Sequence, residues 1–96
     1  MSTTSNSSVL SAANMGTDWL AINPGKFSAS VQGSFVGRVS LQRSFDGGVT
    51  GETVTQYEDL AADTLDAAEP MLVRLYILPG DWQSGQAFCR LGQYAR

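Results

Sequence analysis

The sequence contains no histidine and a single cysteine, Cys89. Without an imidazole, one chain cannot form a Ser–His–Asp triad or a Cys–His pair, because both need histidine as the general base. A lone cysteine cannot close an intramolecular disulfide, which excludes a disulfide-stapled secreted module. We therefore expect a protein that is not an enzyme, with no catalytic residue, no cofactor and no metal, in which Cys89 is a buried structural thiol.

Basic residues are also few, with six Lys and Arg against nine Asp and Glu and a net charge of −3. A phosphate backbone requires a basic face, so we expect no nucleic-acid partner. No apolar run approaches the roughly 20 residues of a membrane span, and the longest, residues 71–78, is interrupted by Arg74. Residues 1–16 lack the basic and apolar regions of a signal peptide, which predicts synthesis in a cytoplasm and no membrane partner.

The sequence does contain a clear alternation of apolar and polar residues with a period of two. Between residues 33 and 45, Phe, Val, Leu and Phe at positions 35, 39, 41 and 45 alternate with polar residues at 38, 40, 42 and 44. This pattern predicts one long strand with an apolar and a polar face. Asp46-Gly47-Gly48 follows, and such a turn needs at least one glycine with positive φ.

Further short strands are predicted where alternation or β-prone residues recur, at 19–22, 26–32, 52–60, 71–78 and 86–91. Turn signals separate them, including Gly33-Ser34. Residues 61–70 are expected to form an irregular connection or a short turn of helix. Together these elements predict an all-β fold, a small antiparallel β-sandwich of about six to seven strands, Ig-like or jelly-roll-like.

The chain length predicts one domain, with an arm at its N-terminus. Residues 1–14 are rich in Ser, Thr, Asn and Ala and have little to bury, so we expect a flexible N-terminal arm that is dispensable for folding, followed by the β-sandwich domain at 15–96. The arm is either a frayed terminus or a segment that orders against a neighbouring subunit. In the second case Val9 and Leu10 are its anchors.

The segment Ser44-Phe45-Asp46-Gly47-Gly48-Val49-Thr50 matches Ser-x-Asp-x-Gly-x-Thr and resembles the Asp-box hairpin of sialidase-like propeller blades. The resemblance implies that the Asp and Thr side chains hydrogen-bond the turn. Gly51 stands where that family has tryptophan, so the packing anchor is missing. The segment occurs once, which favours a well-capped hairpin over a sugar-cleaving site or a cation at Asp46.

Two other groups of residues are candidates for binding. Five acidic residues lie between 58 and 69, either as a solvated loop or as a surface for a basic partner, and their spacing does not fit a calcium loop. A hydrolase using a pair of carboxylates is the least favoured hypothesis. Aromatic side chains near turns and ends serve as core lids or interface anchors. The predicted interface residues are Val9, Leu10, Tyr76, Trp82 and Tyr94.

Four segments of the chain resemble small β proteins encoded among the structural genes of tailed bacteriophages and prophages: residues 33–48, Ala68-Glu69-Pro70-Met71-Leu72-Val73-Arg74-Leu75-Tyr76, Gly80-Asp81-Trp82-Gln83-Ser84-Gly85 and Arg90-Leu91-Gly92-Gln93. The resemblance covers about residues 16–93. It implies a virion protein of the capsid decoration or cement type, which binds the major capsid protein or other virion subunits as a symmetric homo-oligomer. The alternative is a carbohydrate- or receptor-binding module of a phage fibre, with Trp82 and Tyr76 exposed on one concave surface.

Overall fold

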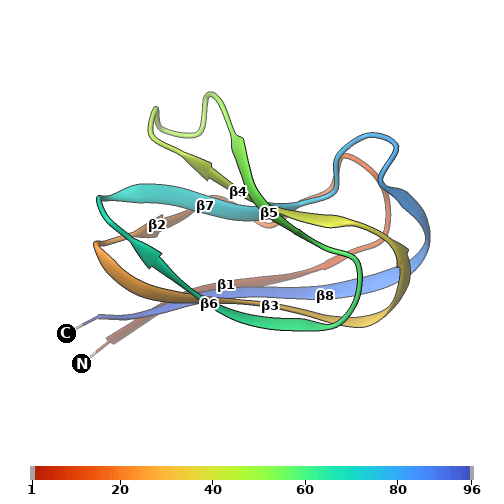
Figure 1. Ribbon diagram of the computed structural model, residues 1–96, viewed down its shortest axis with the longest axis horizontal. Helices are drawn as coiled ribbons and strands as arrows, with labels where there is room; N and C mark the ends of the chain where they lie inside the picture. The colour runs from red at the N-terminus through yellow and green to blue at the C-terminus, as the bar shows by residue number, and fades with distance from the viewer. Residues whose placement is uncertain (1, 96) are drawn as a thin grey trace.

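Two four-stranded antiparallel sheets face each other in the computed structural model, which describes residues 2–95 and gives only the backbone for residues 2–4 and 94–95 (Figure 1). Sheet A contains, in order, β1 (Ser2–Leu10), β8 (Trp82–Ala95), β3 (Gly25–Gly37) and β6 (Ala61–Ala67). Sheet B contains β2 (Leu20–Ile22), β7 (Met71–Tyr76), β4 (Val39–Ser44) and β5 (Glu52–Tyr57). The described residues include no helix that could cross a membrane.

The strand order follows a simple rule. The first strand pairs with the last, β1 with β8, and in the same way β2 pairs with β7, β3 with β6 and β4 with β5. The chain is thus folded in half at the turn after β4, and the doubled ribbon is wound so that successive pairs alternate between the sheets. This is the topology of an eight-stranded jelly roll. The all-β sandwich prediction is confirmed, with eight strands in the described residues where about six to seven were predicted.

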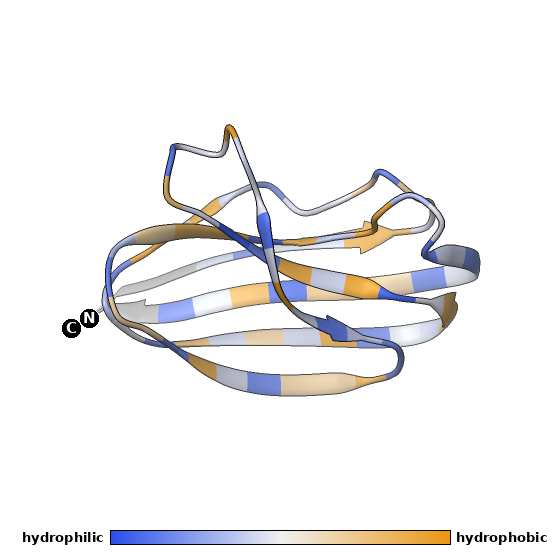
Figure 2. Cartoon of the chain, turned by 45° about the horizontal axis from the view of Figure 1, so that its top comes forward, coloured by the Kyte–Doolittle hydropathy of each residue, from blue (hydrophilic) through white to orange (hydrophobic). Residues whose placement is uncertain are grey.

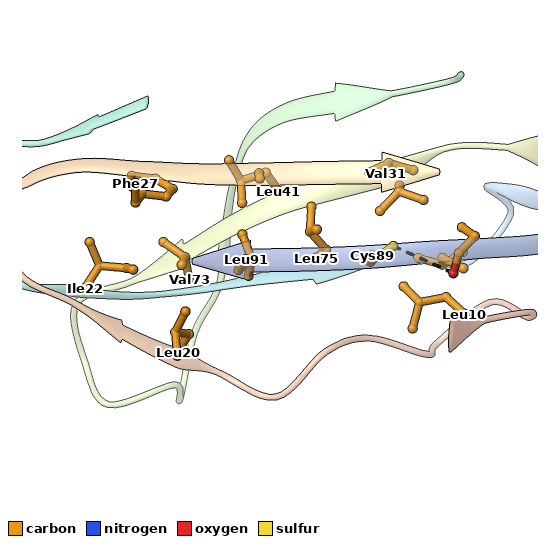
Figure 3. Close-up of a cluster of buried hydrophobic side chains, with 14 of the residues drawn as sticks. Leu10, Leu20, Ile22, Phe27, Val31, Leu41, Val73, Leu75, Cys89 and Leu91 are labelled. Atoms are coloured by element: carbon orange, nitrogen blue, oxygen red, sulfur yellow. Dashed lines mark hydrogen bonds between the residues drawn. The ribbon is translucent and has the colours of Figure 1, made fainter. Parts of the chain in front are cut away.

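The core lies between the sheets and is built from alternate residues of the strands. Figure 2 shows hydrophobic and hydrophilic residues alternating along the strands, and Figure 3 shows a cluster of the buried side chains. β3 and β8 contribute three buried apolar residues each, and β2, β4 and β7 contribute two each. Val31, Val73 and Leu91 are fully buried, and Phe27 is 3% exposed. Cys89 is buried among them, as predicted, and burial raises the pKa of its thiol to about 12.

The predicted single strand at 33–45 is wrong. Gly33-Ser34 is not a turn, because β3 continues through it to Gly37. The ladder between β3 and β8 shifts register at Val36/Gly37, and the chain then leaves sheet A and enters sheet B as β4. Gly37 has φ 154°, and a Cβ there would collide with the carbonyl of Asp81, so glycine permits the crossing.

The predicted polar face of β4 is not exposed either. Ser40, Gln42 and Ser44 are only 0%, 5% and 2% exposed, whereas Phe45, predicted to point inward, is 53% exposed. β4 is a central strand, and side chains on the outside of sheet B cover its polar face, among them Arg74 and Gln56, which hydrogen-bond Gln42 and Ser40. Alternation correctly predicted the strand, but not that both of its faces are covered.

Two segments predicted to be irregular are strands. Residues 2–10 of the expected arm form β1, which pairs with β8 along its whole length, and Leu10 is 1% exposed in the core. The predicted boundary between a flexible arm at 1–14 and a domain at 15–96 is therefore wrong for these residues; residue 1 lies outside the described range. Residues 61–67 form β6, which pairs with β3. Both segments are strands because they form backbone hydrogen bonds with a neighbouring strand. Their residue types alone do not predict this pairing.

Candidate interaction surfaces

The hairpin loop at residues 45–51 is held by its own side chains. The Ser44 hydroxyl donates to Asp46 Oδ1 at 2.6 Å, and the Thr50 hydroxyl donates to Asp46 Oδ2 at 2.6 Å. The backbone N–H of Thr50 donates to Asp46 Oδ1, and that of Gly48 donates to Ser44 Oγ. The hydrogen bonds that Ser44 and Thr50 donate to the carboxylate hold the pKa of Asp46 down at about 2. The Asp-box likeness thus corresponds to a side-chain-capped hairpin.

Both glycines of the turn have positive φ, 75° at Gly47 and 91° at Gly48, which confirms the predicted turn chemistry. A Cβ on Gly47 would meet nothing within 4 Å, but one on Gly48 would lie 2.9 Å from Trp19 Cδ1. A Cβ on Gly51 would also lie 3.3 Å from the Trp19 ring. Trp19, which precedes β2, therefore packs against the hairpin at Gly48 and Gly51.

An aromatic–cationic cluster continues from Trp19 across the outside of sheet B. The Arg74 guanidinium carbon lies 4.4 Å from the centroid of the Trp19 ring and 4.1 Å from that of Tyr76. Arg74 Nε donates to Gln42 Oε1 at 2.9 Å. Burial lowers the pKa of Arg74 from its ordinary value, and no carboxylate of the described residues forms an ion pair with it. The cluster joins the hairpin to the sheet through stacking and one charged hydrogen bond.

The acidic residues between 58 and 69 are distributed over β6 and the turns that flank it, not gathered at one site. Asp63 accepts a hydrogen bond from the Tyr57 hydroxyl at 2.9 Å, and burial together with this bond raises the pKa of Tyr57. Asp66 pairs with Lys26, and Glu58 pairs with Arg38. In the described part of the chain, no group of three or more potential ligands is placed to hold a metal ion.

The outer face of sheet A is formed by β1, β8, β3 and β6. Its side chains are mainly Ser, Gln, Ala and Thr, and its ion pair between Lys26 and Asp66 links β3 to the edge strand β6. Phe88 of β8 is 50% exposed and lies directly opposite Val9 of β1, which is 45% exposed. The two side chains line a shallow hollow of about 490 Å³ together with Ser7, Ser30, Gln32 and Arg90.

The structure separates the predicted interface residues. Val9 lies on the outer face of sheet A, whereas its neighbour Leu10 points into the core. Successive residues of a strand face opposite sides, so these two could not both be surface anchors. The side chain of Tyr94 lies outside the described residues, although its backbone pairs with Thr3.

Tyr76 and Trp82 do not form one surface. Tyr76 stacks on Arg74 on the outside of sheet B, whereas the Trp82 ring stacks on Phe35, with centroids 5.3 Å apart, and packs against the core. Trp82 Nε1 is buried without an acceptor among the described residues. The sequence predicts that Trp82 is either an interface anchor or a lid on the core, and the structure supports the lid.

Sequence reasoning missed the residues that define these surfaces. Phe88 lies in the strand predicted at 86–91, between Ala87 and Cys89, whose burial places Phe88 on the outer face. Trp19 lies almost 30 residues from the hairpin in the sequence, and no sequence pattern links the two. Comparison with known proteins adds no further assignment, because no family model, curated protein or solved structure matches this chain.

Proposed function

We propose that the protein is a non-enzymatic structural component of a bacteriophage particle, of the capsid decoration type. In this proposal it is made in the host cytoplasm and resides in the virion. Its partner is the major capsid protein, which it binds through the outer face of sheet A.

Two considerations favour this class of protein. The sequence resembles small structural proteins of tailed phages, and the double-sheet jelly roll is an architecture found in viral capsid domains. The second consideration is an analogy of fold, and a fold by itself hosts many functions. The assignment therefore depends on a surface that fits the role.

The exposed pair Phe88 and Val9 is the observation on which the proposal rests. Beside the pair lie the uncharged side chains of Ser7, Ser30 and Gln32, and an exposed aromatic ring is the usual anchor of a contact with another protein. Arg90 adjoins the pair and has no ion-pair partner among the described residues. A carboxylate on the capsid surface would complement it.

Co-sedimentation of the protein with purified shells of the parent phage tests the proposal. We expect Phe88→Ser to weaken binding by roughly tenfold or more, because an anchor residue contributes on the order of 2 kcal/mol. Phe45→Ser is the matched control, since Phe45 is 53% exposed at the hairpin on the other sheet, and it should bind like the wild type. Failure of the wild-type protein to co-sediment, or equal losses in both variants, would contradict the proposal.

A further inference from the structure

The two sheets have four edge strands in the described residues, β1, β6, β2 and β5. Each edge strand presents unpaired backbone N–H and C=O groups, which can accept a strand from another chain. Proteins normally protect such edges with charges, proline, irregular register or very short strands. The four edges of this molecule differ in that protection.

Three edges are protected. β2 is three residues long and is followed directly by Asn23 and Pro24. β5 begins with Glu52, and its ladder with β4 shifts register between Leu41 and Gln42. β6 carries Asp66 on its outer face and Asp63 on its inner face. An inward-pointing charge such as Asp63 disfavours pairing of the edge with another strand.

The fourth edge, β1, has none of these features. Its nine residues, Ser-Thr-Thr-Ser-Asn-Ser-Ser-Val-Leu, include no charged residue, no proline and no glycine. It pairs with β8 in unbroken register from Ser2 to Leu10. No backbone hydrogen bond joins its other side to any described residue. β1 is therefore a long, regular and open template.

We infer that β1 is a self-association edge, at which two copies of this chain pair β1 to β1 in antiparallel fashion about a two-fold axis. Identical antiparallel strands are self-complementary, because each residue pair across the axis occurs twice. A partner strand must itself have an unprotected edge, and the chain supplies one in β1. The absence of charge on the strand means that self-pairing places no like charges opposite each other. The two copies would share one continuous eight-stranded sheet.

Sedimentation equilibrium over about 10 μM to 1 mM tests this inference, because an edge contact buries little area and is expected to be weak. The wild type should approach twice the 10.2 kDa chain mass at the upper concentrations. The double variant Ser5→Lys with Ser7→Lys places charges on the exposed side of β1, and we expect self-association to weaken by roughly tenfold or more. Thr64→Lys is the matched control, since Thr64 is exposed on β6, the opposite edge of the same sheet, and it should associate like the wild type.

Hydrogen exchange on the wild-type protein gives a second, independent measurement. Amides at alternate positions of β1 should become more protected as concentration rises, while those of β5 and β6 should not change. This result would support the inference even if the lysine variants failed to fold. A wild type that remains monomeric up to about 1 mM, or association lost in Thr64→Lys and kept in the β1 variant, would overturn it. Neither readout depends on capsid binding, so the inference can fail or hold independently of the proposed function.

Discussion

The loop at residues 45–51 owes its shape to two different properties of single residues. Asp46, Ser44 and Thr50 supply oxygen atoms that bind the turn's own N–H and O–H groups. Gly48 has no side chain, which permits its positive φ and leaves room for the Trp19 ring. The first property can be recognised in the sequence, whereas the contact with Trp19 cannot.

Replacing the two glycines separates these effects. Gly47→Ala has only the cost of placing a side chain at positive φ, about 1 kcal/mol, because a Cβ there meets no neighbour. Gly48→Ala must in addition displace the Trp19 ring, and we expect it to destabilise the fold by about 2–3 kcal/mol. Urea unfolding of both variants measures the difference. Equal losses of stability would show that Trp19 does not pack against the turn.

The Asp46 carboxylate should make the free energy of unfolding depend on pH in the acid range. Its pKa in the folded protein is about 2, below the ordinary 3.8, because the folded state stabilises the ionised form through hydrogen bonds. Its contribution is therefore complete above the ordinary pKa and is lost as the pH falls towards about 2. We expect Asp46→Asn to lower the melting temperature near neutral pH, by an amount that shrinks below about pH 4. A difference between wild type and variant that stays constant down to about pH 2 would contradict this assignment.

At the level of elements, the strands fall into two groups. β3, β7 and β8 contain alternating apolar residues that bury one face, so their positions could be predicted from sequence. β1 and β6 contain mainly small and polar residues. Their order comes from the ladders to β8 and β3, and a backbone ladder leaves no pattern in the residue types.

A pair of neighbouring substitutions in β1 tests whether this segment belongs to the fold. Leu10 is 1% exposed, and we expect Leu10→Ala to cost about 2–5 kcal/mol through the lost burial and the cavity. Val9→Ala, at a position 45% exposed, should cost less than about 1 kcal/mol. Thermal and urea unfolding compare the two variants. If both variants matched the wild type, residues 2–10 would be the dispensable arm that their composition suggests.

At the scale of the whole molecule, the jelly roll joins the two ends of the chain. β1 and β8 pair although most of the sequence separates them, so that Ser2 lies opposite Ala95 (Figure 1). β8 is consequently covered on both sides, by β1 and β3, and becomes a central strand. The same winding leaves β1 as an edge and sets Phe88 beside Val9. The two surfaces proposed for binding are thus products of topology.

The sequence alone was enough to predict the β class, most of the core-facing positions and the chemistry of the hairpin cap, because these depend on residue alternation and on groups within a few positions of one another. The tertiary structure decided which strands pair, why the polar face of β4 is covered, and which tryptophan lies under Gly48. It also decided that Leu10 is part of the core, that Tyr76 stacks on Arg74 and that Trp82 stacks on Phe35. Distant strands pair in the arrangement that buries the apolar faces of all eight strands at once. The free energy of that burial depends on the whole fold, so no local segment of the sequence reveals it.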